Sequence, residues 1–278
     1  MTVAERGEEL RAADGVRLHL RSWPVPAPRA AVLVSHGLGE HGGRYAALAA
    51  DLAERGIGVH AIDHRGHGLS GGARGHVNRF AEYVRDLEQA RARVAAASSA
   101  PLFLLGHSLG GLIAIRHLQT HTEAPFRGAI LSAPLLGVAV RAPRWKVAVS
   151  GLLSRIAPRI PFSNAVDPGE LSAEEEYAAA YRADPLVHAL ITPRLYTEMM
   201  AAIRAAFADR DTVHLPMLVL APEADRIVLP EAVARWAAAC PGDVDVRRYP
   251  GFRHEPLNER DRHRAVADVA GWIDGRLA

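Results

Sequence analysis

Three features are scarce or missing in this chain of 278 residues, and each absence excludes a class of protein. Cysteine occurs once, at Cys240, which excludes an internal disulfide framework; we interpret this thiol as a small buried side chain near a helix end. No run of about 18 apolar residues is present, so no segment is expected to span a membrane. The net charge is only +2 and basic runs are missing, which disfavours a nucleic-acid partner.

What remains is ordinary globular composition, 49% hydrophobic and 23% charged, with ample length for a buried core. Residues 1–9 are charged and lack an apolar signal region, so we expect a soluble protein in the cytoplasm. The length fits one large domain with an insertion as well as it fits two domains.

Short apolar runs alternate with helical patterns along most of the chain. Strands are predicted at residues 16–20, 31–34, 57–62, 102–105, 128–131, 217–220 and 244–247. Helices are predicted at residues 45–55, 80–97, 112–118, 231–239 and 265–277. This alternation is typical of an α/β fold with a mostly parallel sheet and helices on both faces.

One stretch breaks the alternation. Residues 137–211 show helical patterns but no convincing strand, and they are rich in Ala, Arg and Pro. The strand rhythm resumes at Leu215. We therefore predict a core made of residues 1–136 and 212–278, with residues 137–211 inserted as a helical cap.

The most informative motif is Gly106-His107-Ser108-Leu109-Gly110, which follows a predicted strand and opens a predicted helix. A strand–turn–helix setting is typical of a nucleophile elbow, in which a strained turn lifts the serine hydroxyl above the sheet. Glycine is needed on both sides because a Cβ there would collide with the neighbouring strand or helix. The motif predicts Ser108 as a catalytic nucleophile.

A serine hydroxyl is a weak nucleophile until an imidazole takes its proton, and a carboxylate must orient that imidazole. In sheets with such an elbow, the acid and then the histidine follow the serine, each on a loop after a strand. Asp225 and His254 follow the predicted strands at 217–220 and 244–247. The rivals are Glu223, closer to its strand end, and His263, at the start of the last helix. We predict a triad of Ser108, Asp225 and His254.

Such chemistry also needs backbone N–H groups that stabilise the oxyanion of the tetrahedral intermediate. One donor is expected at Leu109, the residue after the nucleophile, and the other at Leu38, in the glycine-rich turn after the strand at 31–34. The alternative is that residues 36–39 form a glycine-rich turn with no such role.

The 14 histidines of the chain make a metal site a possibility to test against their spacing. Five are close in sequence, namely His36, His41, His60, His64 and His67. Glycine interrupts the run from His64 to His67, and no cysteine or acidic cluster completes a ligand shell. The glycines at 71–75 lack the lysine and hydroxyl spacing of a nucleotide-binding loop. We expect neither a metal nor another cofactor.

These residues lie in segments that resemble serine hydrolases of the monoacylglycerol lipase and lysophospholipase group, which have the α/β-hydrolase fold. The matching segments are Ser35–Tyr45, Asp63–Gly72, Phe103–Gly111, Ser132–Leu135, Asp184–Leu186, Ala224–Val228, His254-Glu255 and Asn258-Glu259. The resemblance implies the triad named above, hydrolysis of a single-chain lipid ester through an acyl-enzyme, no cofactor, and a mobile helical lid over an apolar tunnel.

The chain departs from the group in two places. Pro222 stands near the acid, where the group often has glycine; we expect this proline to leave Asp225 in place. The cap matches poorly, so substrate preference is transferred least securely. Its apolar residues recur at helical spacing, at Trp145, Val149, Leu152, Leu153, Ile156 and Ile160, with Lys146, Arg155 and Arg159 among them.

Two interpretations of this cap helix remain open: it packs on the core, or it lies at a membrane surface and admits lipid. For the whole chain we predict cleavage of monoacylglycerols or lysophospholipids to free fatty acid. The alternatives are an esterase, thioesterase or acyltransferase for a smaller acyl substrate, and a non-catalytic binding protein on a hydrolase fold. Acyl length, head group and oligomeric state stay open.

Overall fold

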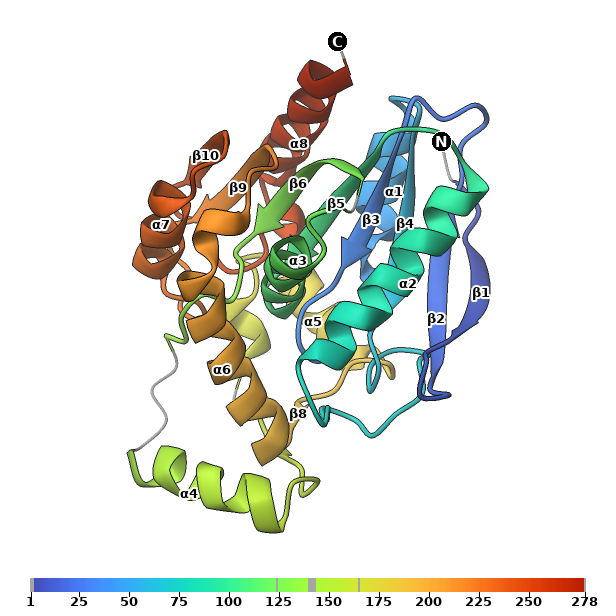
Figure 1. Cartoon of the computed structure of the whole chain (residues 1–278). Helices are drawn as coiled ribbons and strands as arrows, with labels where there is room; N and C mark the ends of the chain where they lie inside the picture. Colours follow the sequence, from blue (N-terminus) through green and yellow to red (C-terminus); the bar gives the residue numbers. More distant parts are fainter. Residues whose placement is uncertain (1–2, 124, 140–143, 165, 278) are drawn as a thin grey trace.

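An eight-stranded sheet runs through the protein, in the order β1-β2-β4-β3-β5-β6-β9-β10 (Figure 1). The computed structural model describes residues 3–123, 125–139, 144–164 and 166–277. The strands are β1 (Arg6–Arg11), β2 (Arg17–Trp23), β3 (Ala30–Ser35), β4 (Ile57–Asp63), β5 (Leu102–His107), β6 (Phe126–Ser132), β9 (Met217–Pro222) and β10 (Val244–Tyr249). β2 pairs antiparallel with β1 and β4, and every other pair is parallel. The predicted fold class is confirmed.

Helices cover both faces of the sheet, as the alternating pattern predicts. They are α1 (Ala46–Ala53), α2 (Ala81–Ala97), α3 (Leu109–Thr120), α7 (Pro230–Ala239) and α8 (Arg262–Leu277). β3 shows why the strands read as continuous apolar runs: Leu33 belongs to the core that contains residues of α2, α3 and α7, whereas Val32 and Val34 belong to the core that contains residues of α1 and α8. The sheet therefore separates two apolar cores, one on each face.

The sequence pattern missed β1. This edge strand reads Arg-Gly-Glu-Glu-Leu-Arg, and only Leu10 in it is buried. A strand with one apolar side chain shows no hydrophobic alternation. β1 is a strand because it pairs with β2, which its own residues do not indicate.

Cys240 caps the C-terminus of α7 and is half-buried, and burial raises the pKa of its thiol to about 11.

The segment between β6 and β9 contains the predicted cap, and we call residues 137–211 the inserted segment. Its elements are α4 (Arg144–Ile156), β7 (Phe162–Ser163), the 3-10 helix η2 (Pro168–Glu170), α5 (Glu175–Ala183), β8 (Leu190–Ile191), α6 (Pro193–Ala208) and η3 (Arg210–Thr212). The prediction that it holds no strand was wrong, because β7 and β8 pair antiparallel. Two residues each are too few for an alternating pattern to be read.

The helices of the inserted segment lie at different depths (Figure 1). α6 packs its Leu195, Met199 and Ile203 into the core that α3 shares, whereas α4 lies beyond α6, away from the sheet. Within the described residues, no helix is both long and apolar enough to cross a membrane.

Candidate active site

Ser108 occupies a sharp turn between β5 and α3, with φ 51° and ψ −118°. A positive φ strains any residue that has a Cβ, so the surroundings must hold this turn in place. The Ser108 N–H donates to the Ser132 carbonyl at 3.0 Å. A Cβ on Gly110 would lie 1.9 Å from the Ser35 carbonyl oxygen, and one on Gly106 would lie 2.6 Å from the Gly110 oxygen. These glycines let α3 begin directly against β3 and β5, as the elbow motif predicts.

Asp225 and His254 come from the loops after β9 and β10, which are parallel neighbours. His254 Nδ1 lies 2.8 Å from Asp225 Oδ2, and both side chains are buried. The other carboxylate oxygen, Oδ1, accepts the N–H groups of Ile227 and Val228 at 2.8 and 2.9 Å. Because Nδ1 faces the carboxylate, Nε2 is the nitrogen left to exchange a proton. Pro222, the last residue of β9, has not displaced the acid.

The charges around this pair favour an imidazolium. Burial alone would lower the pKa of His254, but the Asp225 carboxylate more than offsets it, so the pKa is raised. Burial alone would raise the pKa of Asp225, but His254 and two backbone N–H groups keep it lowered. The His107 ring lies 4.9 Å from the His254 ring, centroid to centroid, which places His254 beside the elbow. Burial and the nearby His254 lower the pKa of His107 to about 4, so His107 stays neutral.

The rival residues lie elsewhere. Glu223 is exposed and pairs with Arg248 at 3.5 Å, and His263 is exposed on α8. Within the described chain the Ser108 hydroxyl has no hydrogen-bond partner, so the acid and the histidine are hydrogen-bonded to each other but the serine and the histidine are not. Catalytic hydrogen bonds of this kind often tighten only when substrate is bound.

The two candidate oxyanion donors flank Ser108. A Cβ on Gly37 would lie 3.3 Å from the Ser108 Cβ, so the Gly37–Gly39 turn runs beside the nucleophile. Gly39 has φ +81°, which turns the chain back sharply. In the residues described, neither the Leu38 N–H nor the Leu109 N–H donates to a protein acceptor. Neither group is thus committed to a protein acceptor there, as an oxyanion site requires.

Three of the sequence-clustered histidines do meet. The His36 ring lies 4.5 Å from His64 and 5.3 Å from His67, and His188 lies 4.8 Å from His67, between centroids. Burial lowers the pKa of His64 and His67 well below the ordinary value, so these rings are neutral packing groups. Among the described residues, no group of three or more His, Cys, Asp or Glu side chains is placed to hold a metal ion.

Sequence reasoning missed a buried ionic network beside His254. It consists of Glu40, Arg44, Glu255 and the two tyrosines that contact them, Tyr177 and Tyr181. Two signals could have found it. Glu40 and Arg44 are four residues apart within a matched segment, and Glu255 directly follows the predicted catalytic histidine.

Comparisons with known proteins agree with this geometry. The family model described as "Serine aminopeptidase, S33" matches residues 26–261. A monoacylglycerol lipase of Mycolicibacterium smegmatis is 34% identical, over 95% of both chains. The crystal structure of a monoacylglycerol lipase from Paleococcus ferrophilus is 31% identical, with a TM-score of 0.86 over 93% of this chain and 99% of that one.

A longer relative shows the same region within a larger protein. An uncharacterized abhydrolase domain-containing protein of Dictyostelium discoideum is 31% identical over 96% of this chain, which spans only 29% of that protein. The resemblance drawn from the motifs is confirmed, and the chain belongs to the S33 serine aminopeptidase family of α/β-hydrolases, among relatives of the monoacylglycerol lipases.

Proposed function

We propose that this protein is a serine carboxylic ester hydrolase that cleaves monoacylglycerols to fatty acid and glycerol. The observation that carries the proposal is the buried Asp225–His254 pair, 2.8 Å apart, beside a serine held at positive φ. The family match describes peptidases, but several relatives that align over nearly the whole chain are monoacylglycerol lipases, and one, from Bacillus subtilis, is a phospholipase. Similarity along the full length, inserted segment included, favours the lipid ester.

In the proposed reaction His254 Nε2 takes the Ser108 proton while Ser108 Oγ attacks the ester carbonyl carbon. The Leu38 and Leu109 N–H groups stabilise the oxyanion that forms. Collapse breaks the bond to glycerol, whose oxygen receives the proton from His254, and an acyl-enzyme remains. Water then attacks with His254 as base, and the fatty acid leaves. Asp225 holds the imidazole and stabilises its charged form.

The other chemistries are less well supported. A thioesterase, a small-ester esterase or an acyltransferase would use the same groups, but the relatives favour none of them over lipid hydrolysis. A non-catalytic binding protein would have no need of a buried carboxylate that raises the pKa of a histidine beside a strained serine. The alternative substrate is a lysophospholipid, which differs from a monoacylglycerol in its head group.

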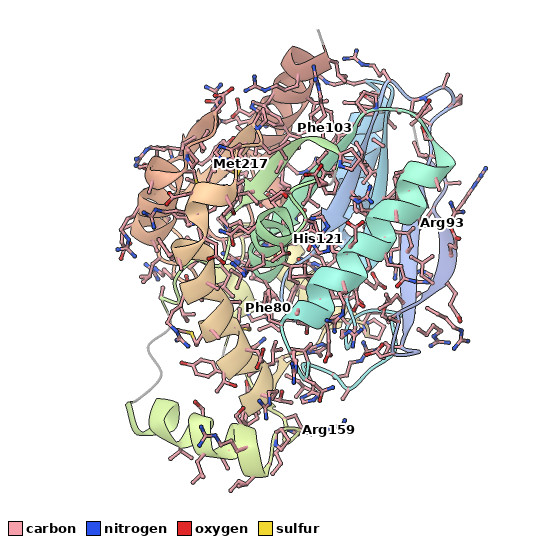
Figure 2. All side chains as sticks on the ribbon, in the orientation of Figure 1. Phe80, Arg93, Phe103, His121, Arg159 and Met217 are labelled. Carbon is pink, nitrogen blue, oxygen red and sulfur yellow. The ribbon has the colours of Figure 1, made fainter. Side chains whose placement is uncertain are left out.

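We also propose that the inserted segment serves as a lid that contacts the membrane surface. Val149, Leu152 and Ile156 on α4 are 40, 58 and 68% exposed, and Ile160 and Phe162, which follow α4 in the chain, are 51 and 47% exposed. Arg155 and Arg159 are also exposed, and Figure 2 shows Arg159 next to α4. Apolar side chains flanked by cations favour an anionic lipid surface. The side chains of Trp145 and Lys146 lie outside the described residues.

The deciding experiment compares initial rates of fatty-acid release from 1-oleoylglycerol, 1-oleoyl-lysophosphatidylcholine and p-nitrophenyl butyrate. We expect the monoacylglycerol to have the highest kcat/KM. The Ser108→Ala variant should fold, lose turnover on all three and lose labelling by a fluorophosphonate. Activity on the short ester alone would contradict the lipid substrate, and activity of Ser108→Ala would contradict the mechanism.

A further inference from the structure

The network beside His254 is buried and has more acid than base. Arg44 sits on the 3-10 helix η1 (Gly42–Tyr45), between two carboxylates. Its Nε donates to Glu40 Oε2 at 3.0 Å, and its Nη2 lies 3.3 Å from Glu255 Oε2. All three side chains are at most 7% exposed. Charges buried this deeply are costly to desolvate, so each one needs its partner.

Helix α5 of the inserted segment closes over the guanidinium of Arg44. The Tyr177 and Tyr181 rings lie 4.6 and 4.4 Å from its central carbon. The two tyrosines differ in one respect. The Tyr177 hydroxyl is hydrogen-bonded to Arg44 and donates to Glu255, whereas the Tyr181 hydroxyl has no hydrogen-bond partner among the described residues. The position of α5 is thus linked to Glu255 through one hydroxyl.

The loop of His254 is held from the same side. The Glu255 N–H donates to the Leu171 carbonyl of the inserted segment at 2.8 Å. Asn258 Nδ2 donates to the Glu255 carboxylate at 2.8 Å, and Arg253 donates to the Ser172 carbonyl at 3.1 Å. The residues before and after His254 are therefore both attached to the inserted segment.

The other end of the network reaches the candidate oxyanion turn. Glu40 Oε1 accepts the N–H of Gly37 and, at 3.1 Å, the hydroxyl of Tyr45. Gly37 precedes Leu38, whose N–H is a candidate oxyanion donor. One chain of contacts therefore runs from α5 through Glu255 and Arg44 to Glu40 and this turn.

We propose that Arg44 and Glu255 are positioning residues, which couple the closed position of α5 to the alignment of His254 and of the Gly37–Leu38 turn. This inference rests on the proposed triad but not on the identity of the ester. When α5 is in place, Tyr177 fixes the Glu255 carboxylate and Arg44 ties it to Glu40. When α5 moves away, both ends of the network lose this restraint.

The excess acid makes the coupling sensitive to pH. Burial would raise the pKa of Glu40, but His107 and Arg44 lower it to about 2, so Glu40 stays ionised. Burial raises the pKa of Glu255 to about 7, Arg44 opposes that rise, and Glu40 adds to it. Glu255 therefore exchanges its proton near neutral pH. The titratable and charged groups around it are Glu40, Arg44, Tyr45, Tyr177, Tyr181 and His254.

The sign of the effect on His254 follows from the charges. The ionised Glu255 raises the pKa of His254, in addition to the larger effect of Asp225. In Glu255→Gln that contribution is lost while the side chain keeps its size. The base is then active at lower pH, and we expect the acid limb of kcat/KM to move down by roughly half to one pH unit.

The test uses the full chain and p-nitrophenyl butyrate, so it does not depend on the lipid head group. Tyr177→Phe and Tyr181→Phe form a matched pair, since both keep the ring over Arg44 and only the first removes a hydrogen-bonded hydroxyl. We expect Tyr177→Phe to lower kcat about 5- to 30-fold with little change in KM, and Tyr181→Phe to stay within about 2-fold of wild type. Thermal melting checks that each variant folds.

Equal kcat values for the two phenylalanine variants would overturn the inference, as would an unshifted acid limb in folded Glu255→Gln. If Glu255→Gln does not fold, the tyrosine pair alone decides. Failure to cleave monoacylglycerol while these differences persist on the short ester would contradict the proposed substrate and leave the positioning role intact.

Discussion

The carboxyl edge of the sheet and the helix α4 differ in how the fold holds their side chains. At the edge, Ser108, Asp225 and His254 are each buried: the Ser108 N–H donates to the last residue of β6, and Asp225 accepts two backbone N–H groups and pairs with His254. On α4, Leu152 and Ile156 are more than half exposed. The chemical groups are thus buried and hydrogen-bonded at the ends of the strands, whereas the apolar surface proposed to meet lipid lies on an exposed helix.

The attachment of α4 shows the same contrast. The hydroxyls of Ser154 and Thr197, on α4 and α6, are hydrogen-bonded at 2.9 Å, and Arg194 donates to the Ser154 carbonyl at 2.7 Å. None of the described α4 residues belongs to either apolar core. A helix whose described residues contribute to neither core opens at a lower free-energy cost than a strand inside the sheet.

The largest expected effect is at the rigid edge. Asp225→Asn should lower kcat by about 10³- to 10⁴-fold, because an amide no longer fixes the tautomer of His254 or stabilises its charge. Glu223→Gln, at the rival acid two residues earlier, is the control and should leave kcat within about 2-fold of wild type. Steady-state kinetics on a soluble ester measure both. A similar loss in the two variants would mean that the acid was assigned to the wrong residue.

A pair of glycine substitutions compares the stability of the two regions. Gly110→Ala should lower the free energy of unfolding by at least about 3 kcal/mol, because the new Cβ would lie 1.9 Å from a backbone oxygen. Gly151→Ala on α4 meets nothing within 4 Å and should raise the stability of that helix by up to about 1 kcal/mol. Urea denaturation measures both. Equal tolerance at the two positions would remove the contrast between the regions.

The smallest expected effect is at the membrane. Replacing Leu152 and Ile156 by serine should weaken binding to vesicles of phosphatidylcholine and phosphatidylglycerol about 10-fold, with hydrolysis of a soluble ester unchanged. Leu69→Ser is the control, since Leu69 is also exposed but lies outside the inserted segment. Co-sedimentation measures the binding. An equal loss in Leu69→Ser would show that the effect is not specific to α4.

Sequence alone determined much of the fold and of the candidate site, because the signals involved are local. A buried parallel strand has to be apolar on both faces, so β3 and β5 could be read directly. A strained elbow needs glycine on either side of its serine, so Ser108 could be found from five residues. Chain order then selected Asp225 and His254, and the structure places these two in contact.

Only the tertiary structure decided the edge strand and the buried ionic network, because both depend on contacts between distant segments. β1 is a strand because β2 lies beside it, although its own residues are mostly charged. Arg44 and Glu255 are 211 positions apart, and neither shows in the sequence that burial will pair them. Burial turns such exposed-looking charges into a coupled network, and burial is a property of the whole fold rather than of any short segment.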